Sequence, residues 1–377
     1  MRKKFLQSIS RKKKQNNYMK EIPVKYAFPL FTKHNSTNYL IKNDHIRVSD
    51  IWAFWQYIIR RYVKKYAGEK DFLLTLIEQA QYFYEAAEAA PIKSQPLLYY
   101  YSFLNLVKVV INVNTLNIYG STKEYFHGIE SCSIHKGDKL KDLYVEIQGL
   151  IGSRTKISVA YQFMTQMGDI LPIPPKYKLN VVDMLRSCIG IHRTYCETNN
   201  SNETYVQVGD LHLFKDGERL YSKYKVQKCT PQIQAGLISK GYNIIEDTDV
   251  FGVTTYYWEE DMFMLGYKPT KFDYYMLAKQ LNKKGIWYFT DGDRYKTFIS
   301  TDPLHISTES IIYCLMFFFG SITRYHPYLF DSLLTDQQMW LISEFLKTQP
   351  KQFLHAVTSR TIECAILKPN TANLIFR

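Results

Sequence analysis

The stretch Pro96-Leu-Leu-Tyr-Tyr-Tyr-Ser-Phe-Leu-Asn-Leu-Val-Lys108 is apolar around most of a helical surface, which predicts a buried helix from about Pro96 to Asn112. A second run of the same kind, Ile311 to Phe319, predicts another buried helix that ends before Pro327. Both helices are too apolar to stand alone in water. We therefore expect them to pack against each other in the interior.

Further helices are expected on both sides of this pair. Apolar residues recur at helical spacing over 51–66 and 72–90, and Pro91 ends the second of these helices. Toward the C-terminus, helices are predicted at about 336–347 and 349–356. Helical patterns thus occupy both ends of the chain.

The middle of the chain has a different pattern. Short strands are expected at 143–147 and 156–161, followed by a helix over 181–195. From Tyr205 to about Glu259, short β-like runs alternate with turn residues. The run 251–258 is the clearest of these strands because it is rich in aromatic and β-branched residues.

These patterns predict an α+β fold, with helical N- and C-terminal parts that pack together and a β-rich section between them. The expected parts are a basic flexible tail at 1–20, a helical part at 21–130, a mixed, β-rich part at 131–300 and a C-terminal helical part at 301–377. The last of these is expected to pack on the first helical part.

Positive charge is concentrated at the N-terminus. The first twenty residues hold eight lysines and arginines, among them Lys12, Lys13 and Lys14, and no acid. These eight charges leave a net +5 for the other 357 residues of a chain whose net charge is +13. A mobile polybasic arm binds nucleic-acid phosphates without reading sequence, although a solvated tail without a partner has the same composition. We expect any nucleic-acid affinity to come mostly through this tail.

The cysteines and the apolar runs bear on the compartment. The six cysteines are scattered without a Cys-x-x-Cys pair, which fits a reducing cytoplasm. The basic N-terminus lacks the apolar segment of a secretory signal. The run Ile311 to Phe319 is far shorter than the ~20 residues that span a bilayer. We expect a cytoplasmic protein without a membrane partner.

Four stretches of the sequence are informative when they are taken together. They are Glu85-Ala-Ala-Glu-Ala-Ala-Pro91 with Pro96 to Lys108, Phe126-His127-Gly128-Ile129, Leu179-Asn-Val-Val-Asp-Met-Leu185 with Ile191-His192-Arg193-Thr-Tyr195, and Phe317-Phe-Phe-Gly-Ser321 with Arg324-Tyr325-His326-Pro327. These stretches resemble the YaaC-like family of bacterial proteins, since all four occur in the family's order with similar spacing, and the first and fourth are the most specific. The resemblance implies a cytoplasmic bacterial protein and brings no catalytic assignment.

Polar residues follow one side of the helix predicted at 96–112. Ser102, Asn105 and Lys108 are three residues apart and fall within about a third of the helix circumference. Buried polar groups need partners. This side is therefore either a ligand-facing groove in which Asn105 and Lys108 bind an anion, or an internal polar network or solvent-exposed strip.

Arg324 and His326 stand where the apolar C-terminal helix ends. Arg324 can bind a phosphate or carboxylate through two hydrogen bonds, with His326 as an acid or base. The alternative role is structural, because cations at a helix C-terminus offset the macrodipole and bond the last carbonyls.

Arg186 and His192 are separated by five residues on the helix predicted at 181–195. Their spacing resembles the Arg-x4–6-His pattern of HEPN ribonucleases, in which paired motifs at a dimer interface cleave RNA. If the chain cleaves RNA, we expect His192 to transfer the proton and Arg186 to stabilise charge developing on the phosphate. So short a motif also arises by chance in a basic chain with nine histidines.

No complete metal or cofactor motif occurs in the sequence. Cys188, His192 and Cys196 are four residues apart and share a face if the helix continues. Buried cysteines and core histidines explain the same spacing, so no metal is predicted. The sequence holds no Walker A loop, GxGxxG, HExxH or GxSxG motif, so no cofactor is predicted.

Two classes of function remain open from the sequence, which does not decide whether the chain is an enzyme. One is a nucleic-acid-associated, RNA-cleaving effector in phage defence, supported by the tail and the Arg186/His192 spacing. The other is a non-enzymatic interaction or scaffold protein, supported by 31 tyrosines and 22 phenylalanines, which suit partner surfaces. The expected partners are nucleic acid, bound through the tail, and a protein partner or a second copy of the chain.

Overall fold

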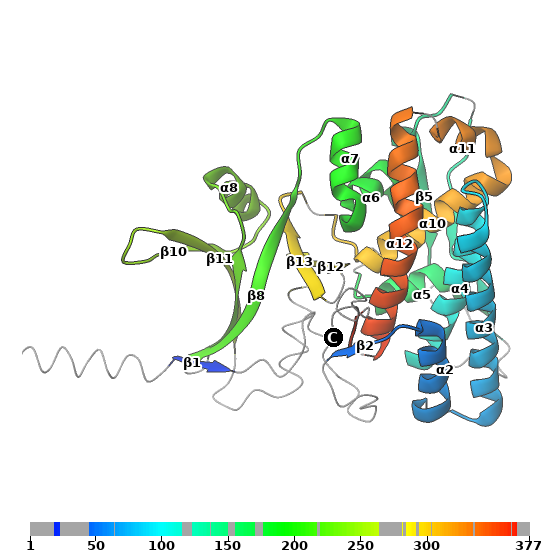
Figure 1. Cartoon of the computed structure of the whole chain (residues 1–377), viewed down its shortest axis with the longest axis horizontal. Coiled ribbons are helices and arrows are strands. Elements are labelled where there is room, and N and C mark those ends of the chain that lie inside the picture. Colours follow the sequence, from blue (N-terminus) through cyan, green and yellow to red (C-terminus); the bar gives the residue numbers. More distant parts are fainter. Residues whose placement is uncertain are drawn as a thin grey trace, which may run out of the picture. The chain divides into compact units, whose positions relative to one another are not determined.

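The structure is a computed structural model of the chain, drawn in Figure 1. It describes residues 19–22, 45–63, 65–114, 123–135, 137–149, 155–169, 176–216, 219–263, 281, 284–291, 294–302, 304–334, 336–362 and 364–367. The chain divides into two compact units. The larger takes residues 37–203, 287–295 and 304–377, and the smaller takes 1–36, 204–286 and 296–303.

Long helices dominate the larger unit. They are α2 (Ile51–Tyr62), α3 (Ala67–Ala89), α4 (Gln95–Asn114), α10 (Thr308–Tyr325) and α12 (Asp336–Ile362). α4 packs against both α3 and α10, and α12 packs against both α4 and α10. The predicted packing of the two apolar helices, α4 and α10, is therefore confirmed.

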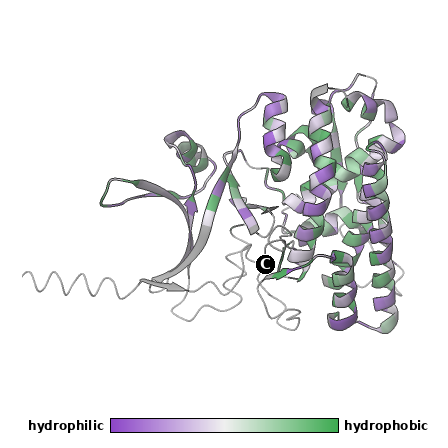
Figure 2. Ribbon diagram, viewed as in Figure 1, coloured by the Kyte–Doolittle hydropathy of each residue, from purple (hydrophilic) through white to green (hydrophobic). Residues whose placement is uncertain are grey.

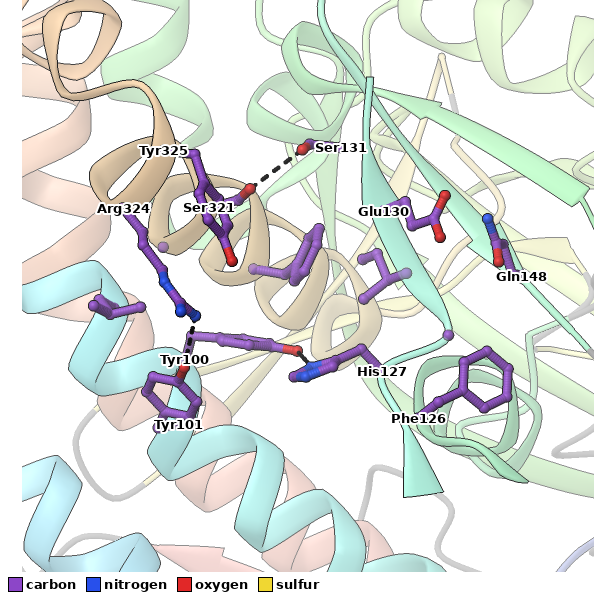
Figure 3. A pocket seen from close by; sticks show the side chains of 15 residues that line it. Tyr100, Tyr101, Phe126, His127, Glu130, Ser131, Gln148, Ser321, Arg324 and Tyr325 are labelled. Atoms are coloured by element: carbon purple, nitrogen blue, oxygen red, sulfur yellow. Dashed lines mark hydrogen bonds between the residues drawn. The ribbon is translucent and has the colours of Figure 1, made fainter. Parts of the chain in front are cut away.

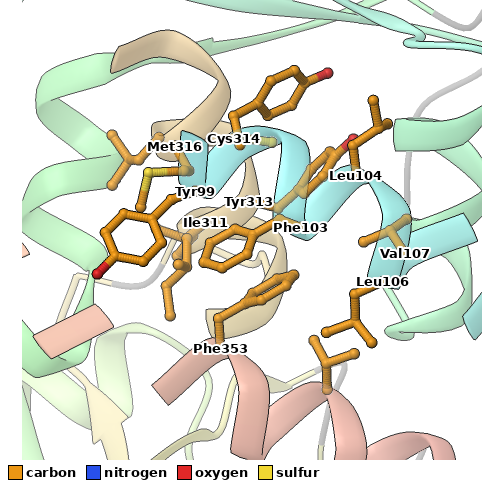
Figure 4. Close-up of a cluster of buried hydrophobic side chains, with 14 of the residues drawn as sticks. Tyr99, Phe103, Leu104, Leu106, Val107, Ile311, Tyr313, Cys314, Met316 and Phe353 are labelled. Carbon is orange, nitrogen blue, oxygen red and sulfur yellow. The ribbon is translucent and has the colours of Figure 1, made fainter. Parts of the chain in front are cut away.

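The interior of the larger unit is an aromatic and aliphatic core around α4 (Figure 4). Phe103 of α4 stacks on Phe353 of α12 with ring centroids 4.0 Å apart. Phe163 and Tyr313 pack against Phe353 with centroids 5.9 and 6.4 Å away. All four side chains are fully buried, so α4 is apolar on most sides because neighbouring elements cover it on most sides.

Hydropathy distinguishes the core helix from the helices that cover it. Among the described residues, Gln95–Val113 of α4 is long and apolar enough to cross a membrane by length and composition, and 72% of it is buried inside the protein. A core helix passes the same test. Hydrophilic and hydrophobic residues alternate along α2 and α3 in Figure 2, as expected for helices with one exposed face.

Shorter elements complete the larger unit. They are α5 (Val159–Gln166), α6 (Val181–Ser187), α7 (His192–Asn199), α11 (Pro327–Leu333), the 3-10 turns η1 (Leu140–Asp142) and η2 (Ile189–Ile191), and the strand β12 (Trp287–Asp291).

Small sheets also belong to the larger unit. β2 (His45–Arg47) pairs in parallel with β14 (Ala365–Leu367), β3 (Glu124–Phe126) pairs in parallel with β6 (Lys156–Ser158), and β4 (Ile129–Ser131), β5 (Tyr144–Gln148) and β7 (Lys176–Asn180) form an antiparallel sheet in that order. Only His127 and Gly128 separate β3 from β4. Because β3 is paired with β6 and β4 is paired with β5, strand pairing fixes the backbone on both sides of these two residues.

An antiparallel sheet forms most of the smaller unit. It contains β10 (Ile244–Thr248), β11 (Thr254–Phe263), β9 (Arg219–Val226), β8 (Tyr205–Asp216) and β13 (Arg294–Ser300) in that order, with β1 (Met19–Ile22) also paired to β8. The helix α8 (Pro231–Ser239) contacts β10. Trp258 stacks on Tyr224 at 5.0 Å and meets the edge of Tyr242 at 5.3 Å. Helices at both ends of the chain and strands between them confirm the α+β class.

Two predicted helices differ from the structure in their continuity. The helices expected at 336–347 and 349–356 form one helix, α12, with Pro350 inside it. Buried Phe345 and Phe353 on either side of the proline hold the helix in the core, so packing outweighs the loss of one hydrogen bond. The helix expected over 181–195 is interrupted by η2 at Ile189–Ile191. There, a Cβ on Gly190 would lie 2.3 Å from the Gln349 side chain, so the chain bends where α12 approaches closely.

Two predicted strands also differ from the structure. The strand expected at 156–161 ends at Ser158, because its Oγ accepts a hydrogen bond from Tyr161 N at 3.3 Å and caps α5. The strand expected at 251–258 begins only at Thr254, after a turn around Gly252 with φ +79°. Aromatic and β-branched composition extended that prediction into the turn.

Candidate functional site

A cavity of about 480 Å³ lies in the larger unit between α4, α10 and the segment from β3 to β4 (Figure 3). α4 contributes Leu97, Tyr100 and Tyr101, and α10 contributes residues spaced at one-turn intervals along one helical face. The complete lining is Leu97, Tyr100, Tyr101, Phe126, His127, Gly128, Ile129, Glu130, Ser131, Gln148, Phe317, Gly320, Ser321, Arg324 and Tyr325. Its volume and mixture of aromatic and polar groups are typical of a small-molecule site.

Gly320 sets the approach of α10 to α4 at the cavity wall. A Cβ at this position would lie 3.3 Å from both the Pro96 carbonyl oxygen and the Tyr100 Cβ atom. The two helices are therefore slightly closer than a residue with a Cβ at this position would allow without a shift. On the neighbouring strand, the Ser131 hydroxyl is 3.2 Å from the Ser321 hydroxyl, which links β4 to α10. The cavity wall is thus assembled from elements that hold one another directly.

Tyr100 and His127 form the central polar pair of the cavity. The Tyr100 hydroxyl hydrogen-bonds His127 Nδ1, and the two rings are stacked with centroids 5.7 Å apart. Burial raises the pKa of Tyr100, which is 5% exposed, so its phenol stays protonated. Burial and the nearby Lys108 cation lower the pKa of His127. A neutral His127 that accepts the Tyr100 proton at Nδ1 carries its own proton on Nε2 and can donate it.

The turn that presents His127 depends on Gly128. Gly128 has φ +67°, and a Cβ there would lie 1.8 Å from Ser158 Oγ. The same hydroxyl donates to the Gln148 carbonyl at 2.5 Å and caps α5. The backbone on both sides is anchored too, because Ala160 N donates to the His127 carbonyl at 3.0 Å and Gln148 N donates to the Gly128 carbonyl at 2.8 Å.

Charged groups stand on two sides of the cavity in Figure 3. The exposed Arg324 donates to the Tyr101 hydroxyl at 3.3 Å, and its Cζ lies 4.9 Å from the Tyr325 ring centroid. The exposed Glu130 lies near Gln148 on the other side. Within the described part of the chain, neither Arg324 nor Glu130 forms an ion pair. The cation and the carboxylate are therefore both available to a ligand.

The arrangement can bind a ligand that has an anionic end, a flat apolar body and a hydrogen-bond donor. Arg324 suits an anion because its guanidinium makes charge-assisted hydrogen bonds. The rings of Tyr101, Phe126 and Tyr325 offer flat surfaces for stacking. Glu130 accepts hydrogen bonds on the opposite side.

The residues predicted at the end of α10 lie apart. Arg324 lines the cavity, whereas His326 does not. His326 joins two helices: its backbone N–H donates to the Ile322 carbonyl at 2.8 Å, and its own carbonyl accepts from Leu329 N at 3.0 Å. The structure therefore places Arg324 in the wall of the cavity and His326 at a helix junction.

The polar side predicted for α4 is mostly an internal network. Ser102 donates to the Ala80 carbonyl of α3 at 2.7 Å, and Asn105 donates to the Gln79 side chain at 3.4 Å. Both residues are buried. Lys108 lies elsewhere, with Nζ 5.5 Å from the Tyr125 ring centroid, and burial lowers its pKa. Neither Asn105 nor Lys108 lines the cavity.

Arg186 and His192 contact each other through the backbone. His192 Nδ1 hydrogen-bonds the Arg186 carbonyl at 2.6 Å, and Nε2 lies 3.5 Å from Cys196 Sγ. His192 is 2% exposed, and burial is the main cause that lowers its pKa. This placement favours a role in holding the bend between α6 and α7.

The cysteines near His192 do not form a shared metal site with it. Cys188 Sγ is directed to the Gln349 side chain at 3.4 Å, on the far side of the interruption from Cys196. No cluster of three or more histidine, cysteine, aspartate or glutamate side chains suited to a metal occurs among the described residues. None of the six cysteines forms a disulfide. Lys12, Lys13 and Lys14 lie outside the described residues.

Sequence reasoning missed Tyr100, His127 and Glu130 as site residues. Three of the four stretches that carry the family resemblance meet at this cavity: Pro96 to Lys108, Phe126 to Ile129, and Phe317 to Pro327. The resemblance of these three stretches to one family was the feature of the sequence that could have indicated the cavity. No single stretch has a catalytic motif, so their common location is visible only in the folded structure.

Comparison with known proteins agrees with the resemblance. A family model described as YaaC-like Protein matches residues 43–361. This range includes every residue of the cavity. No curated protein and no solved structure matches the chain.

Proposed function

The chain belongs to the YaaC-like family, whose model covers most of its length, and from this premise and the cavity we propose that the protein binds a small ligand with the chemistry of a nucleotide. Such a ligand has an anionic phosphate, a flat aromatic base and hydrogen-bond donors on that base. The cavity between α4, α10 and the β3–β4 segment offers a counterpart to each of these three features.

The observation that carries the proposal is the position of Arg324. It is an exposed guanidinium at an aromatic-lined cavity of about 480 Å³, without a carboxylate partner in the described part of the chain. Its contacts with Tyr101 and Tyr325 orient it rather than neutralise it. An anionic group of a ligand would supply the missing counter-charge.

The opposite side of the cavity supports a base more than an aliphatic chain. Glu130 and the half-buried Gln148 present acceptors for an exocyclic amine or ring N–H, and Phe126 provides a stacking surface. His127 stands between the two charged sides, with Nδ1 engaged by Tyr100. Its Nε2–H can donate to a sugar or base acceptor.

Calorimetric titration of the full chain with AMP, GMP, CMP and UMP tests the proposal. At least one mononucleotide is expected to bind, and its nucleoside and inorganic phosphate are each expected to bind more weakly. Arg324→Ala should weaken the binding by roughly 10- to 100-fold, the effect of losing a hydrogen bond to a charged group of about 1.5–3 kcal/mol.

Arg193→Ala is the matched control. Arg193 is an exposed arginine of the same unit, paired with Glu203 at 3.1 Å and absent from the cavity lining. Its removal should leave nucleotide binding unchanged. If no mononucleotide binds at millimolar concentration, or if Arg324→Ala binds as the parent does, the proposal is wrong.

RNA cleavage in phage defence remains a prediction from the sequence. Its support is the spacing of Arg186 and His192, and the burial of His192 weighs against it. The test is an RNA-cleavage and cell-toxicity assay of His192→Ala beside the parent, after the variant's fold and oligomeric state are shown to be unchanged. Parent activity that survives in the variant removes His192 from the mechanism.

A second candidate function is self-association through the β10–β11 hairpin of the smaller unit. Val250, Phe251 and Val253 at its tip are 93, 87 and 59% exposed. The Asp249 carboxylate holds this tip by accepting from Phe251 N and Val253 N, both at 2.9 Å. Large apolar side chains on an ordered exposed turn mark interaction sites.

A second copy of the chain is the occupant that the charges favour. The hairpin carries exposed Glu246, Asp247 and Asp249, whereas the chain as a whole has a net charge of +13. Sedimentation velocity of the parent and of Phe251→Asp should then show an oligomer only for the parent. A parent that is monomeric at all accessible concentrations would contradict this candidate.

A further inference from the structure

The C-terminal end of α2 carries an exposed basic and aromatic surface. Tyr57, Arg60 and Arg61 lie at i, i+3 and i+4, so a helix places them on one face. Together with Ala53 and Gln56 they line a surface hollow of about 430 Å³. Tyr57 is 52% exposed, and both arginines are exposed. We call Tyr57, Arg60 and Arg61 the α2 patch.

The two arginines are not needed to finish the helix. Val63 N donates to the Ile58 carbonyl at 3.3 Å, and Lys70 Nζ donates to the Arg60 carbonyl at 3.1 Å. Within the described residues, neither guanidinium has an ion pair or a hydrogen bond. The hydrogen bonds that end the helix therefore use neither guanidinium, and both remain available to an anion.

The charge around the patch is positive. Residues 57–71 contain five lysines and arginines and two acids in the sequence. One acid, Glu69, is 5% exposed, and its carboxylate accepts from Tyr66 N at 3.0 Å. The other, Asp71, is exposed at the start of α3. The patch thus keeps a net positive field beside an exposed aromatic ring.

We propose that the α2 patch binds single-stranded nucleic acid, with Arg60 and Arg61 on backbone phosphates and Tyr57 stacked on a base. Guanidinium pairs bind phosphate oxygens through charge-assisted hydrogen bonds, and stacking on an aromatic side chain tolerates any base. An anionic membrane fits less well, because α2 exposes no large aliphatic side chain that would insert between lipids. This inference is independent of the cavity and of the N-terminal tail.

The experiment uses the full chain, fluorescence polarisation and labelled oligo-U and oligo-dT of about a dozen nucleotides at two salt concentrations. Arg60→Ala/Arg61→Ala should weaken binding at least about tenfold at low salt. It should also reduce the slope of log affinity against log salt by about 1.4, because each single-strand phosphate contact contributes about 0.7. The parent and the variant share the same tail, so their difference reports on the patch.

A matched control removes two other exposed cations of the same unit, Lys141→Ala/Lys347→Ala, which changes the net charge equally. It should bind nearly as the parent does. Tyr57→Ala should weaken binding while Tyr57→Phe retains it, and thermal melts should show that each variant is folded. Tyr328→Ala, at a position 90% exposed on α11, should have no effect.

Three results would overturn the inference. The first is equal affinity of Arg60→Ala/Arg61→Ala and the parent. The second is an equal loss in the lysine control, which would mean that only net charge matters. The third is binding to vesicles containing phosphatidylserine, lost in the arginine variant, with no binding of either oligonucleotide.

Discussion

Gly128→Ala tests whether the turn at His127 requires the absence of a side chain. The added Cβ would lie 1.8 Å from Ser158 Oγ and 2.8 Å from Ser158 Cβ, so Ser158 must move. Moving it breaks the hydrogen bond from Ser158 Oγ to the Gln148 carbonyl and the cap on α5. The substitution therefore affects both the fold and the position of His127 in the cavity.

The magnitude follows from three contributions. Alanine at φ +67° costs about 1–2 kcal/mol because of its Cβ. The lost cap costs about 1 kcal/mol, and the lost hydrogen bond costs another ~1 kcal/mol. We expect the free energy of unfolding to fall by roughly 3–4 kcal/mol. At about 2–4 °C per kcal/mol, the melting temperature should fall by roughly 10 °C.

Gly137→Ala is the control for the backbone cost alone. Gly137 lies in the same unit with φ +99°, and a Cβ there meets no atom within 4 Å. In urea denaturation, Gly128→Ala should lose at least about 2 kcal/mol more of the free energy of unfolding than Gly137→Ala. Adding Ser158→Gly to Gly128→Ala should recover part of that difference. Equal losses at the two glycines would refute the steric reasoning.

Three further predictions concern the core, the acid response and the tail. Leu104 of α4 is 6% exposed and belongs to the core. Leu104→Asp should abolish soluble expression, and Leu104→Ala should lower the free energy of unfolding in urea by about 2–5 kcal/mol. Variants as stable as the parent would show that the core assignment is wrong. Burial lowers the pKa of His127, so just below the ordinary value of ~6.5 the unfolded chain binds more protons. The free energy of unfolding of the parent should therefore fall between pH 7.5 and 5.5, and that of His127→Gln should fall less. An equal fall in the parent and the variant would contradict this role of His127. A chain that starts at Glu21 should lose most nucleic-acid affinity at low salt, and unchanged affinity would assign binding to the folded body.

Local patterns predicted the main helices well. The apolar runs at Pro96–Lys108 and Ile311–Phe319 lie within buried helices, α4 and α10, that pack together. Such runs are informative because apolar surface must leave water whatever its partner is. Helix caps are equally local: at the start of α2 the Asp50 carboxylate accepts from Trp52 N and Ala53 N, both at 3.0 Å.

The cavity could not be read in the same way. Arg324, Tyr100 and His127 are far apart in the sequence, and each has an ordinary structural explanation on its own. Asn105 illustrates the limit: its position on α4 suggested an anion site, yet it contacts Gln79 of α3. Helical periodicity shows which residues share a face of a helix. It does not show what packs on that face, because this depends on other elements of the fold.

The amino-acid sequence by itself determined the α+β class, the apolar helix pair and the family resemblance, because these depend on composition and on neighbours within a few residues. Tertiary structure alone decided the continuation of α12 through Pro350, the bend at Gly190 and the meeting of Arg324 with Tyr101. Each of these depends on contacts between distant segments. The stabilising free energy of these contacts outweighs the conformational preferences of the local sequence, and the contacts form only when the helices pack together.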